Sequence, residues 1–410
     1  MSAVIDTLRA ASDAQVAEAV AWAGETSRRI EVRGAGSKAA IGRPVQADLV
    51  LDVSGLTGVL DYAPAELVLT ARAGTPLAEI EALLAGAGQM LAFEPIDYGP
   101  LLGGAAGQAT LGGVIASNAS GPRRLKDGAA RDHFLGFQAV SGRGEVFKAG
   151  GKVVKNVTGY DLSKLMAGSW GTLSILTEVS LKVLPRPQTC STLLIPGLSD
   201  NDALRAMSLA MGSTADVSGA AHLPGGTAVR SPLPAGLNAE AVTALRLEGF
   251  GPSVAARLAD LKGRLTSFGP STALEPADSE ALWAFLRDAG PLTGDERPVW
   301  RISAPPMQGP SVLAATRTEL ACEGFYDWAG GLVWLAVGSG PDAGEAVVRR
   351  ASAAAGGHAT LIRAPAAVRA TVAVFEPEPP ALAALTRQVK ASFDPLNLLN
   401  PGRMYPEAGG

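Results

Sequence analysis

The first residues whose types and spacing could do chemistry form the segment Arg33-Gly34-Ala35-Gly36-Ser37-Lys38. Residues 29–33 alternate in polarity like a half-buried strand and run directly into this loop. The glycines leave backbone N–H groups free to line a nest for phosphate oxygens, to which Ser37 adds a hydroxyl and Lys38 a charge. The third glycine of a dinucleotide fingerprint is missing, because position 39 is alanine. For this segment alone, a phosphate nest and a plain strand-to-loop turn both remain open.

Two further segments are rich in small residues. Residues 99–121 consist largely of Gly, Ala, Ser, Thr and Asn, with glycines at Gly99, Gly103, Gly104, Gly107, Gly112, Gly113 and Gly121. Such a run cannot build a core of its own, and small side chains let the backbone approach something large and flat. The third segment contains Asn156-Val157-Thr158-Gly159-Tyr160-Asp161-Leu162 and Gly168-Ser169-Trp170-Gly171-Thr172-Leu173.

The elements that must position these segments alternate between strand and helix over residues 1–184. The pattern predicts helices at 16–22 and 162–166, and a third that opens at Thr75-Pro76 with Thr75 as its cap. Strands are expected at 29–33, 49–51, 67–69 and 173–183, the last with one apolar face of Leu173, Ile175, Val179, Leu181 and Val183. Pro185-Arg186-Pro187 is the best domain boundary, because Pro-rich breaks end elements.

The second half has a different order of elements. Strands are expected at 244–250, 299–303 and 358–362, and a hairpin at 325–337 that folds at Gly330-Gly331. Helices are expected at 252–265 and 345–355. This order predicts an antiparallel sheet with helices on one face, an α+β layer.

Composition excludes several classes of protein. The 410 residues carry a net charge of −4, which leaves no global basic field for nucleic acid. Cys190 and Cys322 are too few for a disulfide framework, a thiolate-ligated iron–sulfur cluster or a Cys-rich zinc site, and three scattered histidines show no metal-ligand spacing. No stretch approaches 18 apolar residues, and the N-terminus lacks a signal-peptide pattern. We therefore expect a cytoplasmic chain without a metal site or a transmembrane segment, which would reach a membrane only through partners.

In their order and spacing, the three segments resemble the FAD-binding domain of the vanillyl-alcohol oxidase (PCMH) type. Asp394-Pro395 and Asn400-Pro401-Gly402-Arg403 resemble the closing segment of its FAD-linked D-2-hydroxyacid dehydrogenase branch. A closer resemblance, over nearly the whole chain, is to the FAD-binding E-subunit family of bacterial glycolate oxidase (glycolate dehydrogenase) complexes. It rests on Gly86-Ala87-Gly88-Gln89-Met90-Leu91, Lys155-Asn156-Val157-Thr158-Gly159-Tyr160-Asp161-Leu162 and Gly356-Gly357-His358-Ala359-Thr360. The resemblance implies an α+β fold: a two-lobed FAD domain at 1–184, a smaller antiparallel cap at 188–390, and a return to the flavin at 391–405.

The resemblance also implies a set of FAD-binding residues. The first loop would bind the pyrophosphate through Arg33, Gly34, Ala35, Gly36, Ser37 and Lys38. The second segment would pass beside the flavin ring and diphosphate through Thr110, Gly112, Gly113, Ser117, Asn118 and Gly121, and Pro95 is assigned to the same cofactor. The third would meet the adenine end through Gly171, Thr172 and Ile175, and the closing segment would bring Asn400 and Arg403 near the flavin ring.

The resemblance bears on the attachment of FAD as well. Relatives that bind FAD covalently use a histidine in the first loop or a cysteine in the second segment. This chain has Ser37 at the first place and no cysteine between residues 99 and 121. We therefore expect non-covalent FAD.

Candidates for catalysis are fewer. His358 could act as general base on an alcohol carbon, because imidazole titrates near neutrality, or it could be a structural histidine at a helix-to-strand turn. A base also needs a cation for the substrate carboxylate, for which the candidates are Arg301, Arg363 and Arg403. The basic group Arg123-Arg124 with Lys126 could contact FAD phosphates or a partner's acidic face, or form a solvated corner. Trp300, Trp328 and Trp334 could pack the second domain's sheet or mark a subunit interface.

The function that the resemblance implies is that of an FAD-carrying oxidoreductase subunit in a complex that oxidises glycolate, a small 2-hydroxy acid, to glyoxylate. The His-x-Gly-Asp-Gly-Asn-x-His metal motif of the family's catalytic subunits is absent. We therefore expect the chain to assist a homologous catalytic FAD subunit, with electrons passing on to an iron–sulfur subunit. Two alternatives stay open: a stand-alone FAD-dependent 2-hydroxyacid dehydrogenase that uses His358, and a non-redox scaffold subunit without FAD.

Overall fold

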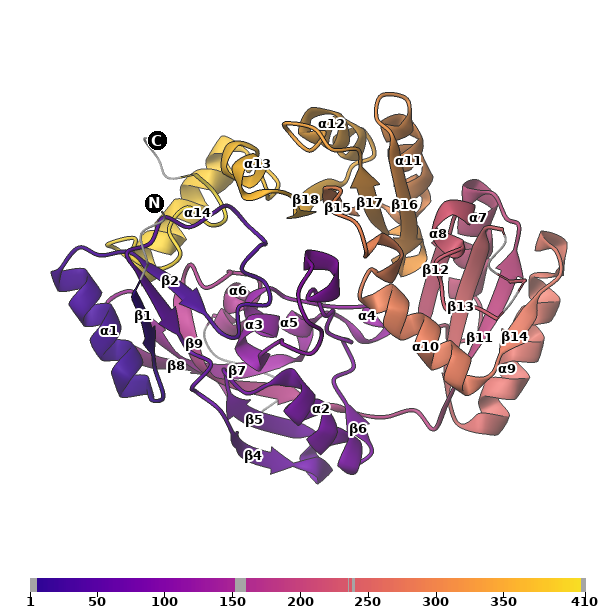
Figure 1. Cartoon of the computed structure of the whole chain (residues 1–410). Coiled ribbons are helices and arrows are strands. Elements are labelled where there is room, and N and C mark those ends of the chain that lie inside the picture. Colours follow the sequence, from indigo (N-terminus) through magenta and orange to yellow (C-terminus); the bar gives the residue numbers. More distant parts are fainter. Residues whose placement is uncertain (1–5, 152–159, 235, 238–239, 407–410) are drawn as a thin grey trace.

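A small parallel sheet forms the N-terminal lobe of the computed structural model, which describes residues 6–151, 160–234, 236–237 and 240–406 (Figure 1). Its order is β1-β3-β2, from β1 (Asp6–Arg9), β2 (Ile30–Arg33) and β3 (Leu49–Asp52). Helix α1 (Asp13–Glu25) begins where the Ser12 side chain accepts a hydrogen bond from the Gln15 backbone. Its apolar face covers the sheet with Val16, Ala19, Val20 and Ala23.

A five-stranded antiparallel sheet forms the second lobe, in the order β4-β5-β9-β7-β8. Its strands are β4 (Val59–Ala63), β5 (Val68–Arg72), β9 (Ser174–Lys182), β7 (Phe134–Ser141) and β8 (Val146–Gly150). Five helices lie in its connections: α2 (Leu77–Gly86), α3 (Leu111–Ala116), α4 (Arg124–Asp127), α5 (Ala130–His133) and α6 (Leu162–Met166). A two-stranded ladder of β6 (Gln89–Met90) and β10 (Leu184–Pro185) precedes the passage to the third sheet.

The third sheet has eight strands in the order β14-β11-β13-β12-β16-β17-β15-β18, all paired antiparallel. The strands are β11 (Thr189–Pro196), β12 (Gly219–Leu223), β13 (Val242–Gly249), β14 (Thr272–Leu274), β15 (Val299–Ser303), β16 (Cys322–Asp327), β17 (Leu332–Val337) and β18 (His358–Arg363). Helices α7 (Asp200–Met211), α9 (Gly251–Arg264), α11 (Gly309–Arg317) and α12 (Glu345–Ala354) fill the cores on one face. The other face packs against the first two lobes together with α8 (Gly225–Ala228) and α10 (Pro276–Arg287).

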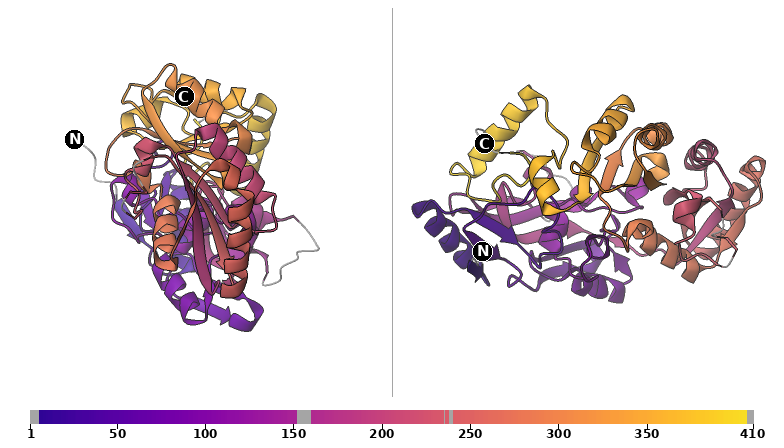
Figure 2. Two further views of the ribbon diagram at one scale, coloured as in Figure 1. Left: turned by 90° about the vertical axis from the view of Figure 1, so that its right-hand side faces the viewer. Right: turned by 45° about the horizontal axis from the view of Figure 1, so that its top comes forward.

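The C-terminal part of the chain returns to the N-terminal lobe. After α13 (Ala366–Thr371) and α14 (Pro380–Phe393), it runs back beside β2, and the right-hand view of Figure 2 shows the yellow end next to the indigo N-terminal lobe. Ile30 N donates to Leu398 O, and Asn400 N donates to Ile30 O. The buried Asp394 carboxylate fixes this return by accepting bonds from the backbone of Leu398 and Leu399.

The α+β class, the hairpin and most of the expected elements are confirmed, with three corrections. Thr75 is not the cap of α2, because its hydroxyl bonds to the backbone of Arg72 and Gly58 instead. The single apolar face expected for residues 173–183 is wrong, because a register shift between β7 and β9 divides it between two cores. Ile175 packs into the core under α1, and Val179 packs into the core that contains α2 and α3. Helices also cover both faces of the third sheet, since α10 lies opposite to α7 and α9.

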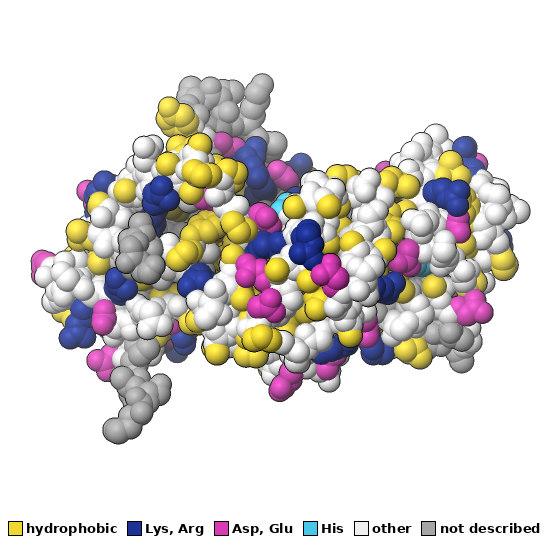
Figure 3. Space-filling view, turned by 90° about the horizontal axis from the view of Figure 1, so that it is seen from above, with side chains coloured by type: hydrophobic (Ala, Val, Ile, Leu, Met, Phe, Trp, Pro, Cys, Tyr) yellow, Lys and Arg dark blue, Asp and Glu magenta, His cyan; other side chains and the backbone are white. Residues whose placement is uncertain are grey.

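Two further observations concern membranes and charge. Within the described ranges, no helix combines the length and apolarity needed to cross a bilayer. Seen from above in Figure 3, Lys and Arg side chains are interspersed with Asp and Glu, and no broad patch of one sign covers this face. This face therefore offers no basic surface of the kind that binds nucleic acid.

Candidate functional site

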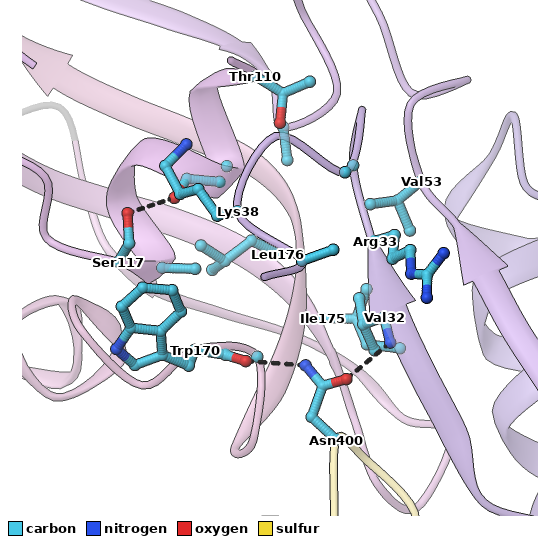
Figure 4. Close-up of a pocket in the computed structure, with 18 of the residues that line it drawn as sticks. Val32, Arg33, Lys38, Val53, Thr110, Ser117, Trp170, Ile175, Leu176 and Asn400 are labelled. Carbon is cyan, nitrogen blue, oxygen red and sulfur yellow. Dashed lines mark hydrogen bonds between the residues drawn. The ribbon is translucent and has the colours of Figure 1, made fainter. Parts of the chain in front are cut away.

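A slot of about 800 Å³ lies where the first two lobes and the C-terminal return meet (Figure 4). The three glycine-containing segments all reach it, although they are far apart in the sequence. The predicted residues among its lining are Arg33, Gly34, Ala35, Gly36, Ser37, Lys38, Thr110, Gly112, Gly113, Ser117, Gly171, Ile175, Asn400 and Arg403.

The first wall of the slot is the loop that leaves β2. Gly34 faces Thr110 so closely that a Cβ at residue 34 would lie 2.5 Å from the Thr110 hydroxyl. Gly36 has φ +77°, a left-handed conformation that glycine adopts without strain, and nothing lies within 4 Å of its missing Cβ. Gly34 is therefore in close contact with Thr110, whereas the space beside Gly36 is open. A nest of free N–H groups requires such an open space for the anion that it binds.

The second wall is the helix α3 with its glycines. A Cβ on Gly112 would meet Ala73 at 2.8 Å, so only glycine lets α3 lie this close to the end of β5. Gly113 faces the Lys38 ammonium, with 3.7 Å from its Cβ position to Nζ. The Ser117 hydroxyl donates to Gly113 O at 2.7 Å. Small residues thus bring backbone, rather than side chains, to the slot.

Two cations without carboxylate partners lie in the slot. The Lys38 side chain is 8% exposed and, within the described part of the chain, its ammonium makes no hydrogen bond or ion pair; burial lowers its pKa to about 8. Arg403 donates from Nη2 to Lys38 O at 2.9 Å, stacks over Trp170, and its buried Nε has no hydrogen-bond partner; burial lowers its pKa to about 10. A buried, unpartnered guanidinium nitrogen beside an unpaired ammonium fits the anionic diphosphate of a dinucleotide.

Asn400 ties the walls of the slot together. Its Oδ1 accepts from Val32 N and its Nδ2 donates to Trp170 O, both at 2.8 Å (Figure 4). Gly171 has φ +70°, and a Cβ there would lie 2.8 Å from Asn400 Nδ2. Both polar atoms of Asn400 are thus used by the protein, so its amide positions β2 and the 170–171 turn.

Four predicted residues do not line the slot. Asn118 has φ +49°, and its Oδ1 accepts from Arg131 N. Gly121 packs against Glu94, and Pro95, the next residue after Glu94, is buried. The Thr172 hydroxyl donates to Ser169 O. The sequence reasoning in turn missed Val53, Ala73, Trp170 and Leu176. Val53 directly follows β3 of the parallel sheet, where the rule that ligands bind beyond the carboxyl ends of parallel strands could have located it. Ala73 follows β5 of the antiparallel sheet, to which this rule does not apply.

The catalytic candidates lie apart from the slot lining. His358 begins β18 opposite Ser303, and burial together with Arg301 lowers its pKa below the ordinary value, so the imidazole is neutral at pH 7. Of the three possible cations, only Arg301 is near His358. Arg363 is paired with Asp295 at 2.8 Å, and Arg403 lies in the slot. The described residues do not include the predicted segment Lys155-Asn156-Val157-Thr158-Gly159. Within the described ranges, no group of three or more His, Cys, Asp or Glu could hold a metal ion.

The fold and slot define the class of protein. Residues 7–150 match the FAD binding domain family. The structure of p-cresol methylhydroxylase with substrate bound superposes with a TM-score of 0.72 at 14% identity, over 98% of this chain and 89% of that one. An alkyldihydroxyacetonephosphate synthase structure gives 0.68 at 17% identity, over 96% and 76%. The chain has the PCMH-type flavoprotein fold, and its cofactor is FAD.

Sequence relatives narrow this class. Glycolate oxidase subunit GlcE of Escherichia coli (strain K12) is 37% identical over 377 residues, which is 92% of either chain. Glycolate oxidase subunit GlcD of Bacillus subtilis (strain 168) is 34% identical over 163 residues, 40% of this chain and 33% of that protein. The chain belongs to the FAD-binding oxidoreductase family of glycolate oxidase subunit GlcE.

Proposed function

We propose that this chain is the FAD-carrying subunit of a complex that oxidises glycolate to glyoxylate. The observation that carries the proposal is the combination of likeness to GlcE over 92% of both chains with a slot lined by residues of the three predicted segments and of the C-terminal return. FAD, when bound, would supply two-electron redox chemistry for the oxidation of a 2-hydroxy acid at C2. In this proposal residues 1–184 hold the cofactor, 188–390 cap it and 391–405 close the slot.

The residues of the slot have separate tasks in this proposal. Lys38 and Arg403 neutralise the diphosphate, and the loop of Gly34 and Gly36 donates backbone N–H groups to it. Gly112 and Gly113 leave room beside α3 for a flat ring. Asn400 holds the lobes at the spacing that the cofactor needs. The other predicted contacts, from Pro95, Asn118, Gly121 and Thr172, would require these residues to reach FAD from outside the present lining.

FAD is held without a covalent bond in this proposal. Ser37 stands in the first loop, and the slot lining contains no cysteine or histidine among the described residues. Cys190 is buried beside Ser279 in the third sheet, where burial raises its thiol pKa to about 11. Such a thiol is a poor nucleophile, because the reactive form is the thiolate.

The partner chains in this proposal are inferred from the related proteins. Its members GlcE and GlcD carry the word subunit in their names, which indicates an assembly of several chains. We extend this to a homologous catalytic flavoprotein that oxidises the hydroxy acid and an iron–sulfur subunit that takes the electrons. Cys190 and Cys322 cannot supply four thiolates for a cluster of the chain's own.

The test is to count flavins in the complex formed with the gene products encoded next to this chain. Gly34→Ala puts a methyl group 2.5 Å from the Thr110 hydroxyl, and Gly263→Ala, which meets nothing within 4 Å, is the matched control. We expect the Gly34→Ala complex to contain one FAD fewer than the wild-type and control complexes, with lower glycolate-dependent dye reduction. A flavin count that does not depend on this chain would instead support the scaffold alternative. Glycolate oxidation by the chain alone would support the stand-alone dehydrogenase.

A further inference from the structure

Two neighbouring arginines in the second glycine segment have opposite surroundings. Arg123 is paired with Glu248 at 2.7 Å and with Glu94 at 3.3 Å, inside a buried network. The guanidinium of Arg124 forms neither a hydrogen bond nor an ion pair within the described ranges, and it lies 4.5 Å from the centre of the Trp328 ring. The charge of Arg124 is therefore half-buried without an ion-pair partner, which costs free energy that a bound anion would offset.

A second arginine without an ion pair lies on the same tryptophan. Arg301 of β15 has its guanidinium 4.8 Å from the Trp328 ring centre, so the two guanidinium carbons are at most 9.3 Å apart, the sum of the two distances. Like that of Arg124, its guanidinium forms no ion pair or hydrogen bond in the part of the chain that the structure describes. Two cations in such proximity repel each other. The pKa of Arg124 is accordingly lowered, mainly by burial and secondly by the charge of Arg301.

The carboxylates around this pair are occupied by other groups. Asp132, which faces Arg124, accepts from Ala129 N at 2.9 Å. Glu376, which faces His358, is paired with Arg349 at 2.7 Å. Asp327, which faces Arg301, is buried and accepts from the backbone N–H of Trp328. Among the described residues, no carboxylate therefore forms an ion pair with either guanidinium group, although Asp132 acts on Arg124 from a longer distance.

The pair lies on the face of the third sheet that packs against the FAD lobes. Arg301 is opposite Thr360 in the β15–β18 ladder, and His358 is two residues along on the same face. In Figure 1, β15 and β18 form the end of this sheet nearer to α13 and α14. Arg124 comes from the FAD side, and the Trp328 indole donates to Gly121 O across the same boundary at 3.0 Å. Tyr98 lies close to Arg301, one residue from Asp97, which acts on Lys38 in the slot.

We propose that Arg124, Arg301 and Trp328 form a carboxylate-binding site, shared between the two halves of the chain, for the anion of a short 2-hydroxy acid. Planar guanidinium groups match a carboxylate with two parallel hydrogen bonds, and both guanidinium groups lie over the Trp328 ring within cation–π distance. His358, neutral at pH 7 and on the same face, is placed to accept the proton of a C2 hydroxyl. This assignment rests on the proposed function for the identity of the acid, and it gives the chain an anion site of its own.

The first test uses wild-type chain loaded with FAD and the non-oxidisable dicarboxylate oxalate. Phenylglyoxal modifies arginines that are accessible and unpaired, and peptide mass spectrometry reads each position. We expect saturating oxalate to slow modification of Arg124 and Arg301 at least fivefold relative to sodium chloride at equal ionic strength. Arg28 is the control for modification and should be unaffected, because it is exposed, has no ion pair among the described residues and lies 5.4 Å from the centre of the Trp22 ring. Arg350, which is paired with Glu319 at 2.6 Å on an exposed helix face, is the control position for the substitutions below. Equal modification rates with and without oxalate would overturn the proposal.

The second test separates binding from a purely structural clamp. Arg124→Met and Arg301→Met are expected to raise the oxalate Kd at least tenfold by calorimetry, whereas Arg350→Met leaves it unchanged. Lower melting temperatures with an unchanged oxalate Kd would show that the arginines only join the two halves, and would refute the site. Because oxalate binding requires no turnover, a chain that binds oxalate but fails to support glycolate oxidation refutes the proposed function alone. Glycolate oxidation without oxalate protection refutes only the anion site.

Discussion

Lys38→Met is expected to make the FAD-free chain more stable and, at the same time, to weaken FAD binding. The ammonium of Lys38 is buried in the slot without a hydrogen bond or ion pair among the described residues, so folding removes it from water with only the more distant charge of Asp97 in compensation. Methionine fills a similar volume without a charge. With FAD absent, the substitution therefore removes a cost, whereas with FAD present it removes a counter-charge to the diphosphate.

The structure sets the size of both effects. Burial lowers the Lys38 pKa from 10.5 to about 8, and at 1.36 kcal/mol per pKa unit this corresponds to about 3 kcal/mol of destabilisation in the FAD-free chain near neutral pH. A hydrogen bond to a charged group contributes about 1.5–3 kcal/mol. Its loss on substitution should raise the Kd for FAD by about 10- to 150-fold.

The pH dependence has a definite sign. Because the folded pKa lies below the unfolded one, the unfolded chain binds more protons between pH 8 and 10.5, so stability of the FAD-free chain rises with pH across this window. FAD affinity runs the other way. Below about pH 8 the ammonium is already charged, whereas above it binding must take up a proton, so affinity falls as pH rises. Lys38→Met should abolish both dependences.

Thermal melting of the FAD-free chain and FAD titration by flavin fluorescence, from pH 6.5 to 9.5, measure both quantities. Lys262→Met is the control, because Lys262 is exposed on α9 and far from the slot in the fold. A Lys38→Met chain that melts below wild type while binding FAD with unchanged affinity would refute the reasoning, since Lys38 would then be a structural cation with a partner.

Three further predictions concern the same slot. Asn400→Ala leaves Val32 N and Trp170 O unpaired and places alanine at φ +43°, so we expect a loss of about 3 kcal/mol, measured by urea unfolding. Arg403→Met should raise the Kd for FAD about tenfold or more while Arg403→Lys restores part of it, as judged by the same fluorescence titration. Acid precipitation should release all of the flavin into the supernatant, and yellow protein in the pellet would show a covalent bond instead.

Much of the fold could be predicted because its elements carry strong local patterns. The strand Val299–Ser303 and the hairpin around Gly330 are apolar, bounded by turn residues, and folded as expected. The strand Asp6–Arg9 was missed, because its four residues are all exposed and it is held only by parallel pairing with β3. The register shift in β9 is set by the partner strand β7, and no pattern within residues 173–183 reveals it.

The slot could be predicted where residue type alone signals function, and not elsewhere. Glycines and the Ser37-Lys38 pair stand out in the sequence, and the structure brings them together. Val53, Ala73 and Leu176 line the same slot, yet they are ordinary apolar residues whose positions become informative only once the sheets are assembled. The meeting of Arg124 and Arg301 on Trp328 joins residues more than 170 positions apart, which no local pattern can indicate.

A structure of the chain determined after loading with FAD tests the central claim most directly. The account predicts one FAD per chain, with the diphosphate against residues 34–38 and Arg403, and the rest of the cofactor running between α3 and the 169–176 segment. Density for FAD at any other place, or a chain that stays colourless with this slot empty under saturating FAD, would contradict it.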